Sequence, residues 1–179
     1  MQITSTVAGR ENAVITLFSD VFSDSDGADE GALIGKLVRQ MLTRTPEADL
    51  VPYLALDGDS LIGAVLFTRL AFAQDPRTVF LLSPMAVATR WQGHGVGQAL
   101  IRAALEDLRA RGVDVAVTYG DPAFYGKTGF QPVSVEALAA PLPLSHPHGW
   151  IAQSLDGTPL TPISGGSACV AALDNPAYW

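Results

Sequence analysis

A glycine-rich turn between an apolar segment and a helical one limits the folds open to this chain more than any other feature of the sequence. The segment covers residues 85–100 and reads MAVATRWQGHGVGQAL. Glycine occupies every second position of the turn, at Gly93, Gly95 and Gly97. Glycine lets the backbone bend tightly and lets a ligand approach it without a Cβ in the way. Apolar residues then recur at helical spacing until Arg111-Gly112, a basic last turn followed by a glycine stop. The segment therefore predicts a strand, a tight turn and an amphipathic helix.

The start of a helix beside such a turn favours an anionic ligand. The first N–H groups of a helix have no partner within it, and the helix dipole is positive at that end. A glycine turn that leads into a helix is therefore typical of a phosphate or pyrophosphate site. The alternative is a plain strand–helix connection, and three alternating glycines favour the anion site over it.

Two familiar phosphate motifs do not fit. A dinucleotide-binding fingerprint needs a third glycine where Gln98 stands, and hairpin strands before the turn fit a βαβ unit poorly. Residues 120–128 (GDPAFYGKT) approach a Walker A loop but place five residues, not four, between the glycines. Gly129 and Pro132 also prevent the long helix that this loop needs. A nucleotide-binding protein is therefore excluded.

Before the turn, the pattern predicts two helices and then hairpin strands. A first strand is expected over residues 3–7, a helix from near Gly9, a polar loop over 23–31 and a second helix capped by Asp29. Strands are expected over residues 51–57, 61–73 and 79–87, the first two joined by an Asp-Gly turn. Pro84 lies in the third strand and predicts a bulge or an unpaired stretch there.

After the long helix, the pattern predicts a strand over residues 113–117 and a short helix capped by Asp121 and ended by Gly129. Further strands are expected over residues 150–155 and 169–173. The order of elements predicts an α+β or mixed α/β fold with a mainly antiparallel sheet. Its length of 179 residues predicts one domain, with a core over residues 1–135 and C-terminal strands and loop over 136–179.

Composition excludes several classes of function. A net charge of −7 disfavours nucleic-acid binding and favours a cationic substrate. The single cysteine, Cys169, excludes a disulfide framework, and the three histidines lack the spacing of a metal site. The sequence shows neither a signal peptide nor an apolar run long enough to span a membrane. We therefore expect a cytoplasmic protein with no metal, no membrane partner and no nucleic acid.

Two motifs carry a resemblance to a known family. Residues 90–95 (RWQGHG) fit the pattern R/Q-x-x-G-x-G/A, and residues 124–130 (FYGKTGF) are similar to Y-x-K-x-G-F. On these motifs the chain resembles the GNAT superfamily of acyl-CoA-dependent N-acyltransferases. The lead-in Gly120-Asp121-Pro122 resembles the YhbS-like acetyltransferases and replaces an asparagine that is frequent in the family. The motifs cover residues 83–132, and the order of elements extends the resemblance to about residues 1–135.

The resemblance implies a mixed, mostly antiparallel central sheet flanked by helices, with two strands that splay where acetyl-CoA binds. The strand before the turn would contact pantetheine, and the N–H groups from Gln92 through Gly97 would hold the pyrophosphate. Arg90 is expected either to reach a phosphate or to be a solvated loop residue, and the side chain of His94 is expected at the loop surface. The implied cofactor contacts are Met85, Ala86, Val87, Arg90, Gln92, Gly93, His94, Gly95, Val96 and Gly97.

The implied reaction is the direct attack of an amine on the thioester of acetyl-CoA. The N–H of Met85 is expected to stabilise the oxyanion, and Tyr125 to protonate the leaving thiolate as general acid. The alternative role for Tyr125 is aromatic packing on a short helix. Lys127 is expected at the surface or near a phosphate. No general base can be assigned among the four candidates, which are Asp26, Glu30, Ser83 and Asp121.

The sequence thus predicts an acetyl-CoA-dependent N-acetyltransferase that acts on a small-molecule or peptide amine, as a monomer or homodimer. The alternative is a non-catalytic module that binds acyl-CoA as a sensor or scaffold. Residues 142–148 lie in a proline-rich segment with two of the three histidines. We expect them to border the acceptor opening, and the alternative is that they only connect the core to the next strand.

Overall fold

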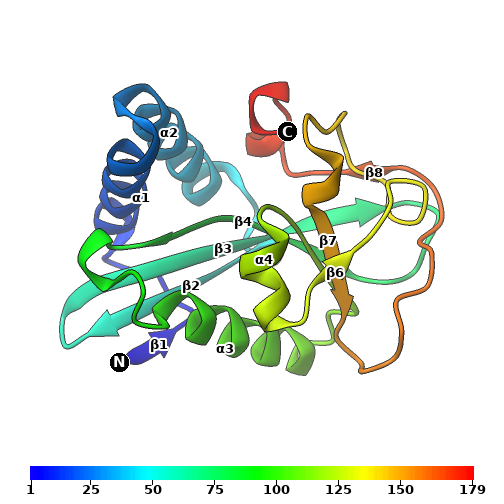
Figure 1. Cartoon of the computed structure of the whole chain (residues 1–179), viewed down its shortest axis with the longest axis horizontal. Coiled ribbons are helices and arrows are strands. Elements are labelled where there is room, and N and C mark those ends of the chain that lie inside the picture. The colour runs from blue at the N-terminus through cyan, green and yellow to red at the C-terminus, as the bar shows by residue number, and fades with distance from the viewer. The chain divides into compact units, whose positions relative to one another are not determined.

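The computed structural model describes all 179 residues, shown in Figure 1. The chain divides into two compact units. The first unit comprises Met1–Phe67 and Pro84–Ala104, and the second comprises Thr68–Ser83 and Leu105–Trp179. Two strands and one helix contribute residues to both units. The single domain expected over residues 1–179 stays a prediction.

The first unit contains two strands and two helices of its own together with parts of three shared elements. They are β1 (Gln2–Thr4), α1 (Glu11–Asp26), α2 (Ala28–Arg44), β2 (Leu50–Asp57), most of β3 (Ser60–Phe72), the end of β4 (Val79–Val87) and the start of α3 (Val96–Ala110). The strands follow the order β1-β2-β3-β4, and β1 pairs antiparallel with β2 from Gln2↔Leu56 to Thr4↔Leu54. The predicted hairpin and the bounds of the third strand are confirmed, whereas the first strand is shorter than expected.

The prediction of a polar loop over residues 23–31 is wrong, because only Gly27 separates α1 from α2. Gly27 has φ +99° and its N–H donates to the carbonyl oxygen of Ser23 at 3.1 Å, so it ends α1. The same glycine stands at the N-cap position of α2, and the expected cap, Asp29, lies inside the helix. The polar residues of this stretch form solvent-facing helix ends, which composition alone does not distinguish from a loop.

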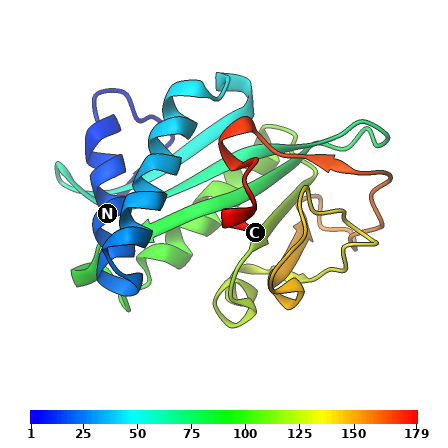
Figure 2. The same cartoon turned by 90° about the horizontal axis from the view of Figure 1, so that it is seen from above.

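Helices α1 and α2 lie side by side, as Figures 1 and 2 show, and small residues line their contact. A Cβ added to Gly31 would lie 2.5 Å from the carbonyl oxygen of Ser19 and 1.8 Å from the Oγ of Ser23. A Cβ at Gly35 would lie 3.2 Å from the Cβ of Ser19. The two glycines therefore let the backbones approach closely, and each helix also buries large apolar side chains such as Phe18 and Met41.

The second unit is a sheet with a short helix. It contains the end of β3, the start of β4, the end of α3, β5 (Val115–Tyr119), α4 (Pro122–Tyr125), β6 (Gln131–Pro132), β7 (Trp150–Ser154) and β8 (Ser167–Ala168). Strand β4 pairs parallel with β5, while β5 with β7, β6 with β7, and β3 with β8 pair antiparallel. The mixed α/β class with a mostly antiparallel open sheet is confirmed.

The strand expected over residues 169–173 is wrong. Strand β8 ends at Ala168, and Ala171–Leu173 form a single 3-10 turn that buries Leu173. A short alternating apolar pattern fits either an extended strand or a turn with one buried residue, so periodicity does not decide between them. The neighbouring expectation of a strand from Trp150 is confirmed by β7. None of the helices is long and apolar enough to cross a membrane.

Candidate active site

The glycine turn lies in the first unit, where it joins the end of β4 to α3. Gly93 and Gly95 have φ values of +77° and +79°, a conformation that other residues rarely adopt. A Cβ added to either glycine would meet no atom within 4 Å. The two glycines are therefore required by the backbone conformation rather than by packing, and the space beside them is open to a ligand.

The N–H groups of this turn form a run of unpaired donors. The N–H of Gln92 donates to the carbonyl oxygen of Thr89 at 3.3 Å, and the first bond of α3 runs from the Ala99 N–H to the Gly95 oxygen at 3.0 Å. Between these two bonds, no backbone N–H from Gly93 to Gly97 donates to a backbone carbonyl with hydrogen-bond geometry. Consecutive unpaired donors at a helix N-terminus are the chemistry that an anion requires. Gln92 was also expected to offer its N–H to the ligand, but this N–H already donates to Thr89.

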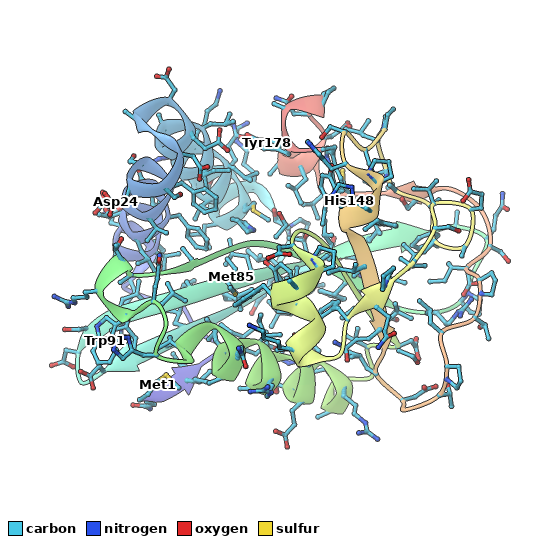
Figure 3. All side chains as sticks on the ribbon, viewed as in Figure 1. Met1, Asp24, Met85, Trp91, His148 and Tyr178 are labelled. Atoms are coloured by element: carbon cyan, nitrogen blue, oxygen red, sulfur yellow. The ribbon has the colours of Figure 1, made fainter.

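Side-chain contacts within the first unit hold the turn in place. The Oγ1 of Thr89 donates to the carboxylate of Asp24 at 2.7 Å, and the Nε2 of Gln92 donates to the carbonyl oxygen of Val87 at 3.0 Å. Figure 3 labels Asp24 on α1 and Trp91 within the turn. The indole Nε1 of Trp91 is buried without a hydrogen-bond partner. The side-chain hydrogen bonds of Thr89 and Gln92 therefore fix the turn, and its backbone N–H groups stay available to a ligand.

The two charged or titratable side chains expected in the turn lie at its surface. Arg90 is exposed, with its guanidinium held by no ion pair. His94 is exposed, and its Nδ1 lies 2.9 Å from the carbonyl oxygen of Gln92. Because a carbonyl only accepts, Nδ1 carries the proton. The side chain of His94 therefore lies at the loop surface, as expected, and Arg90 remains available to an anion.

The end of β4 carries the three residues that were expected to contact the cofactor. Pro84 has no N–H, and the parallel pairing of β4 with β5 ends two residues before it, at Leu82↔Thr118. Of the three expected contact residues, Met85 is half-buried, and Ala86 and Val87 are buried. Their side chains are apolar, so any polar contact that they make with a ligand comes from the backbone.

Tyr125 lies in the second unit, at the end of α4. The carboxylate of Asp121 caps this helix by accepting from the Ala123 N–H at 2.9 Å, and Pro122 occupies the first turn, as expected. A Cβ added to Gly120 would lie 2.6 Å from the ring of Tyr125. The Gly-Asp-Pro lead-in therefore both caps the helix and makes room for the tyrosine ring. Gly129, with φ +98°, follows the helical segment as predicted.

The hydroxyl of Tyr125 is held in its neutral form. Burial raises the pKa of Tyr125 to about 12, a hydrogen bond with the side chain of Thr118 lowers it in part, and the charge of Asp121 raises it. The ring also packs edge-on against Phe130, with centroids 5.9 Å apart. A phenol with a raised pKa stays protonated at neutral pH, which a proton donor requires.

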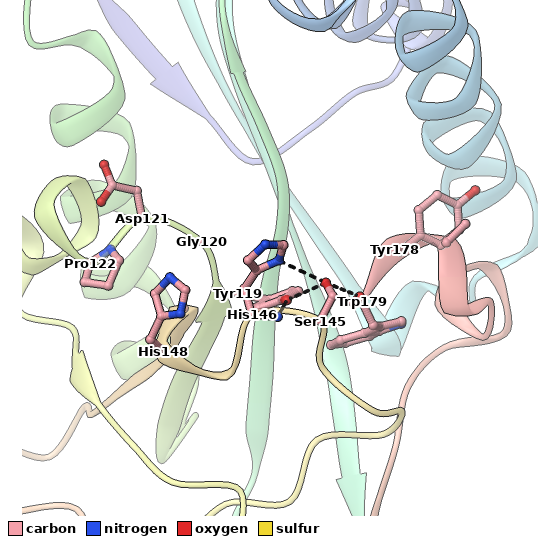
Figure 4. Close-up of a pocket in the computed structure, with 11 residues that line it drawn as sticks. Tyr119, Gly120, Asp121, Pro122, Ser145, His146, His148, Tyr178 and Trp179 are labelled. Atoms are coloured by element: carbon pink, nitrogen blue, oxygen red, sulfur yellow. Dashed lines mark hydrogen bonds between the residues drawn. The ribbon is translucent and has the colours of Figure 1, made fainter.

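The second unit also contains a pocket of about 470 Å³ at the end of β5, shown in Figure 4. It is lined by Tyr119, Gly120, Asp121, Pro122, Ser145, His146, His148, Gly149, Ala177, Tyr178 and Trp179. Three of these residues belong to the segment 142–148, which was expected to border the acceptor opening. The aromatic residues of the last turn were missed, because nothing in their local sequence indicates that they lie beside β5.

The four candidates for the general base lie on different elements of the chain. Asp121 lines the pocket, whereas Ser83 lies within β4 and Asp26 and Glu30 lie on the helix pair α1–α2. No group of three or more His, Cys, Asp and Glu side chains is placed to hold a metal ion.

Comparison with known proteins defines the class. Residues 12–130 match the model of the acetyltransferase (GNAT) family, which covers more than half of the chain. The chain therefore belongs to this family and is an enzyme of the N-acetyltransferase class.

Individual relatives agree with this class. The chain is 32% identical over 154 residues to an uncharacterized N-acetyltransferase of Escherichia coli K12, YjhQ, a match that covers 74% of this chain and 84% of that protein. Its fold is similar to that of E. coli YhbS in complex with CoA, with a TM-score of 0.82, 21% identity and coverage of 97% of this chain and 92% of that one. It is also similar to a GNAT acetyltransferase of Brucella melitensis in complex with acetyl-CoA, with a TM-score of 0.74, 20% identity and 97% of both chains covered.

Proposed function

We propose that this protein transfers an acetyl group from acetyl-CoA to an amine, with the glycine turn as the pyrophosphate site and Tyr125 as the general acid. The observation that carries the proposal is the run of unpaired N–H groups from Gly93 to Gly97. Membership of the family and the CoA or acetyl-CoA bound by two structural neighbours also support it.

The residues of the first unit fit the cofactor. The space beside Gly93 and Gly95 is open, so a phosphate can approach the backbone N–H groups. Exposed Arg90 adds a positive charge to the same turn. Met85, Ala86 and Val87 would contact the pantetheine arm through main-chain groups, and Gln92 would contribute by fixing the turn through Val87.

Acetyl-CoA, Met85 and Tyr125 would each contribute to a different step of the transfer. Acetyl-CoA supplies an acyl group activated as a thioester, which a neutral amine attacks directly: a C–N bond forms and the C–S bond breaks. The N–H of Met85 would stabilise the negative charge that develops on the carbonyl oxygen. The O–H of Tyr125 would give its proton to the departing sulfur, since burial keeps this phenol protonated.

The proposal is tested by measuring release of free thiol from acetyl-CoA in the presence of primary amines. The panel consists of an alkyl diamine, an arylalkylamine and a lysine-containing peptide. We expect release that depends on both the enzyme and at least one amine, with an equal yield of the N-acetyl product. Tight CoA binding without turnover of any amine would instead support an acyl-CoA-binding module that does not catalyse transfer.

A further inference from the structure

The pocket at the end of β5 contains a hydrogen-bond network around Ser145. The Oγ of Ser145 lies 2.8 Å from the carbonyl oxygen of Trp179, 3.0 Å from the hydroxyl of Tyr119 and 3.1 Å from the Nδ1 of His146. The backbone N–H of His146 also donates to the Tyr119 hydroxyl. Figure 4 shows these bonds as dashed lines.

This network favours protonation of His146 at Nδ1. A carbonyl oxygen only accepts, so the single hydrogen of the Ser145 hydroxyl is donated to Trp179. Ser145 must then accept from its other two partners, and Nδ1 of His146 is therefore protonated. In the neutral ring, Nε2 of His146 keeps its lone pair. The network thus presents His146 as a base of fixed tautomer.

The remaining groups around His146 suit a cation. The ring of His148 lies 5.9 Å from that of His146, centroid to centroid. Asp121 lines the same pocket and uses Oδ1 to cap α4, which leaves Oδ2 to a ligand. Tyr119 stacks on Trp179, with centroids 6.3 Å apart, and forms an apolar wall. The titratable and charged groups that line the pocket around His146 are Tyr119, Asp121, His148 and Tyr178.

We propose that this pocket binds the acceptor as a cationic primary amine, with Asp121 contacting the ammonium group and His146 serving as the general base through Nε2. Ser145 and Tyr119 are positioning residues that fix the imidazole. This inference rests on the proposed function and adds to it the acceptor class and the base. Asp121 is assigned to the ammonium group rather than to proton removal, because its Oδ1 accepts from the Ala123 N–H and only Oδ2 is left for the ligand.

Each proton that leaves the amine in the proposed transfer has an acceptor. The ammonium gives one proton to Nε2 of His146, and the resulting neutral amine attacks the thioester. Formation of the C–N bond releases a second proton from the nitrogen to solvent, so the amide keeps one of the three N–H bonds of the ammonium, and the sulfur leaves with the proton of Tyr125. Solvent then removes the proton from His146 and restores the Tyr125 hydroxyl. No oxidant or metal takes part in this sequence.

The kinetic test compares His146→Gln with His148→Gln. Removing a general base lowers the rate by about 10²- to 10⁴-fold. We expect that loss in kcat for His146→Gln, together with loss of the acidic limb of the pH profile, because an imidazole must be neutral to accept a proton. His148→Gln should raise the acceptor KM but keep that limb. Equal kinetics for wild type and His146→Gln would overturn the assignment.

A second measurement does not depend on turnover. Long-range ¹H–¹⁵N correlation spectra of the full chain report which nitrogen of His146 is protonated, and we expect Nδ1–H with unprotonated Nε2. Titration with the alkyl diamine should shift the signals of His146 and Asp121. An Nε2–H tautomer, or no shift with any amine of the panel, would overturn the proposal. Failure of the wild type to bind CoA would instead overturn the proposed function.

Discussion

Tyr125 is proposed as the proton donor, and its ring and its hydroxyl are held in different ways. Its ring is held by Phe124 and Phe130, which any aromatic side chain at this position would also contact. Its hydroxyl, however, is buried, and the pKa of Tyr125 is raised to about 12. Burial of a hydroxyl favours its neutral form. The hydroxyl therefore retains its proton at every pH at which the enzyme would work.

The substitution Tyr125→Phe keeps the ring and removes only the donor. If Tyr125 protonates the leaving thiolate, kcat falls by about 10²-fold while the KM for acetyl-CoA changes little. Steady-state measurement of thiol release gives both values. A kcat within a factor of two of the wild type would show that the ring alone matters, and the thermal stability of the variant serves as its folding control.

At the same scale, residues with a local signal were predictable and residues placed by the fold were not. Gly93, Gly95, Asp121 and Tyr125 stand in motifs whose chemistry follows from neighbouring residues. Trp179 gives no such signal, because its position beside β5 depends on contacts between distant parts of the chain. The base proposed above, His146, was not predictable for the same reason, since its hydrogen-bond network joins Ser145 and Trp179, 34 positions apart in sequence.

At the scale of elements, the strands of the hairpin region and the long helix were predictable, because periodicity and turn residues agree there. The α1–α2 connection was not. Its Ser, Asp and Glu residues are as common in a loop as at exposed helix ends. The close approach of α1 to Gly31 depends on tertiary packing, which the local sequence does not show. Likewise, the turn over Ala171–Leu173 buries one leucine, and the apolar residues around it fit the alternating pattern of a strand equally well.

The α1–α2 contact gives a prediction for stability. In Gly31→Ala the new Cβ meets the backbone oxygen of Ser19, which cannot move as a side chain can. We expect the free energy of unfolding to fall by about 1–3 kcal/mol, as for other overpacked sites. Gly126→Ala is the matched control, since it lies in helical backbone with open space around it. Chemical denaturation should give the control a free energy of unfolding equal to or slightly above that of the wild type. Equal free energies of unfolding for the two variants would contradict the role of packing at Gly31.

At the scale of the whole molecule, the two units carry different parts of the proposed activity. The first unit contributes the turn with its unpaired N–H groups, and the second contributes Tyr125 and the pocket around His146. A net charge of −7 suits a protein whose second ligand is a cation. CoA affinity and acceptor turnover should therefore respond to different substitutions.

Binding of the CoA pyrophosphate by the backbone of the glycine turn is tested by calorimetric titration of CoA into Gly95→Ala. Gly112→Ala is the matched control, because Gly112 has φ +83°, against +79° at Gly95, and neither Cβ would meet a protein atom within 4 Å. Both variants thus carry similar backbone strain, but only Gly95→Ala places a methyl group over the turn. We predict that Gly95→Ala raises the Kd for CoA by about tenfold or more, a change of about 1.4 kcal/mol, while Gly112→Ala leaves it unchanged. Equal CoA affinity in the two folded variants would contradict the account.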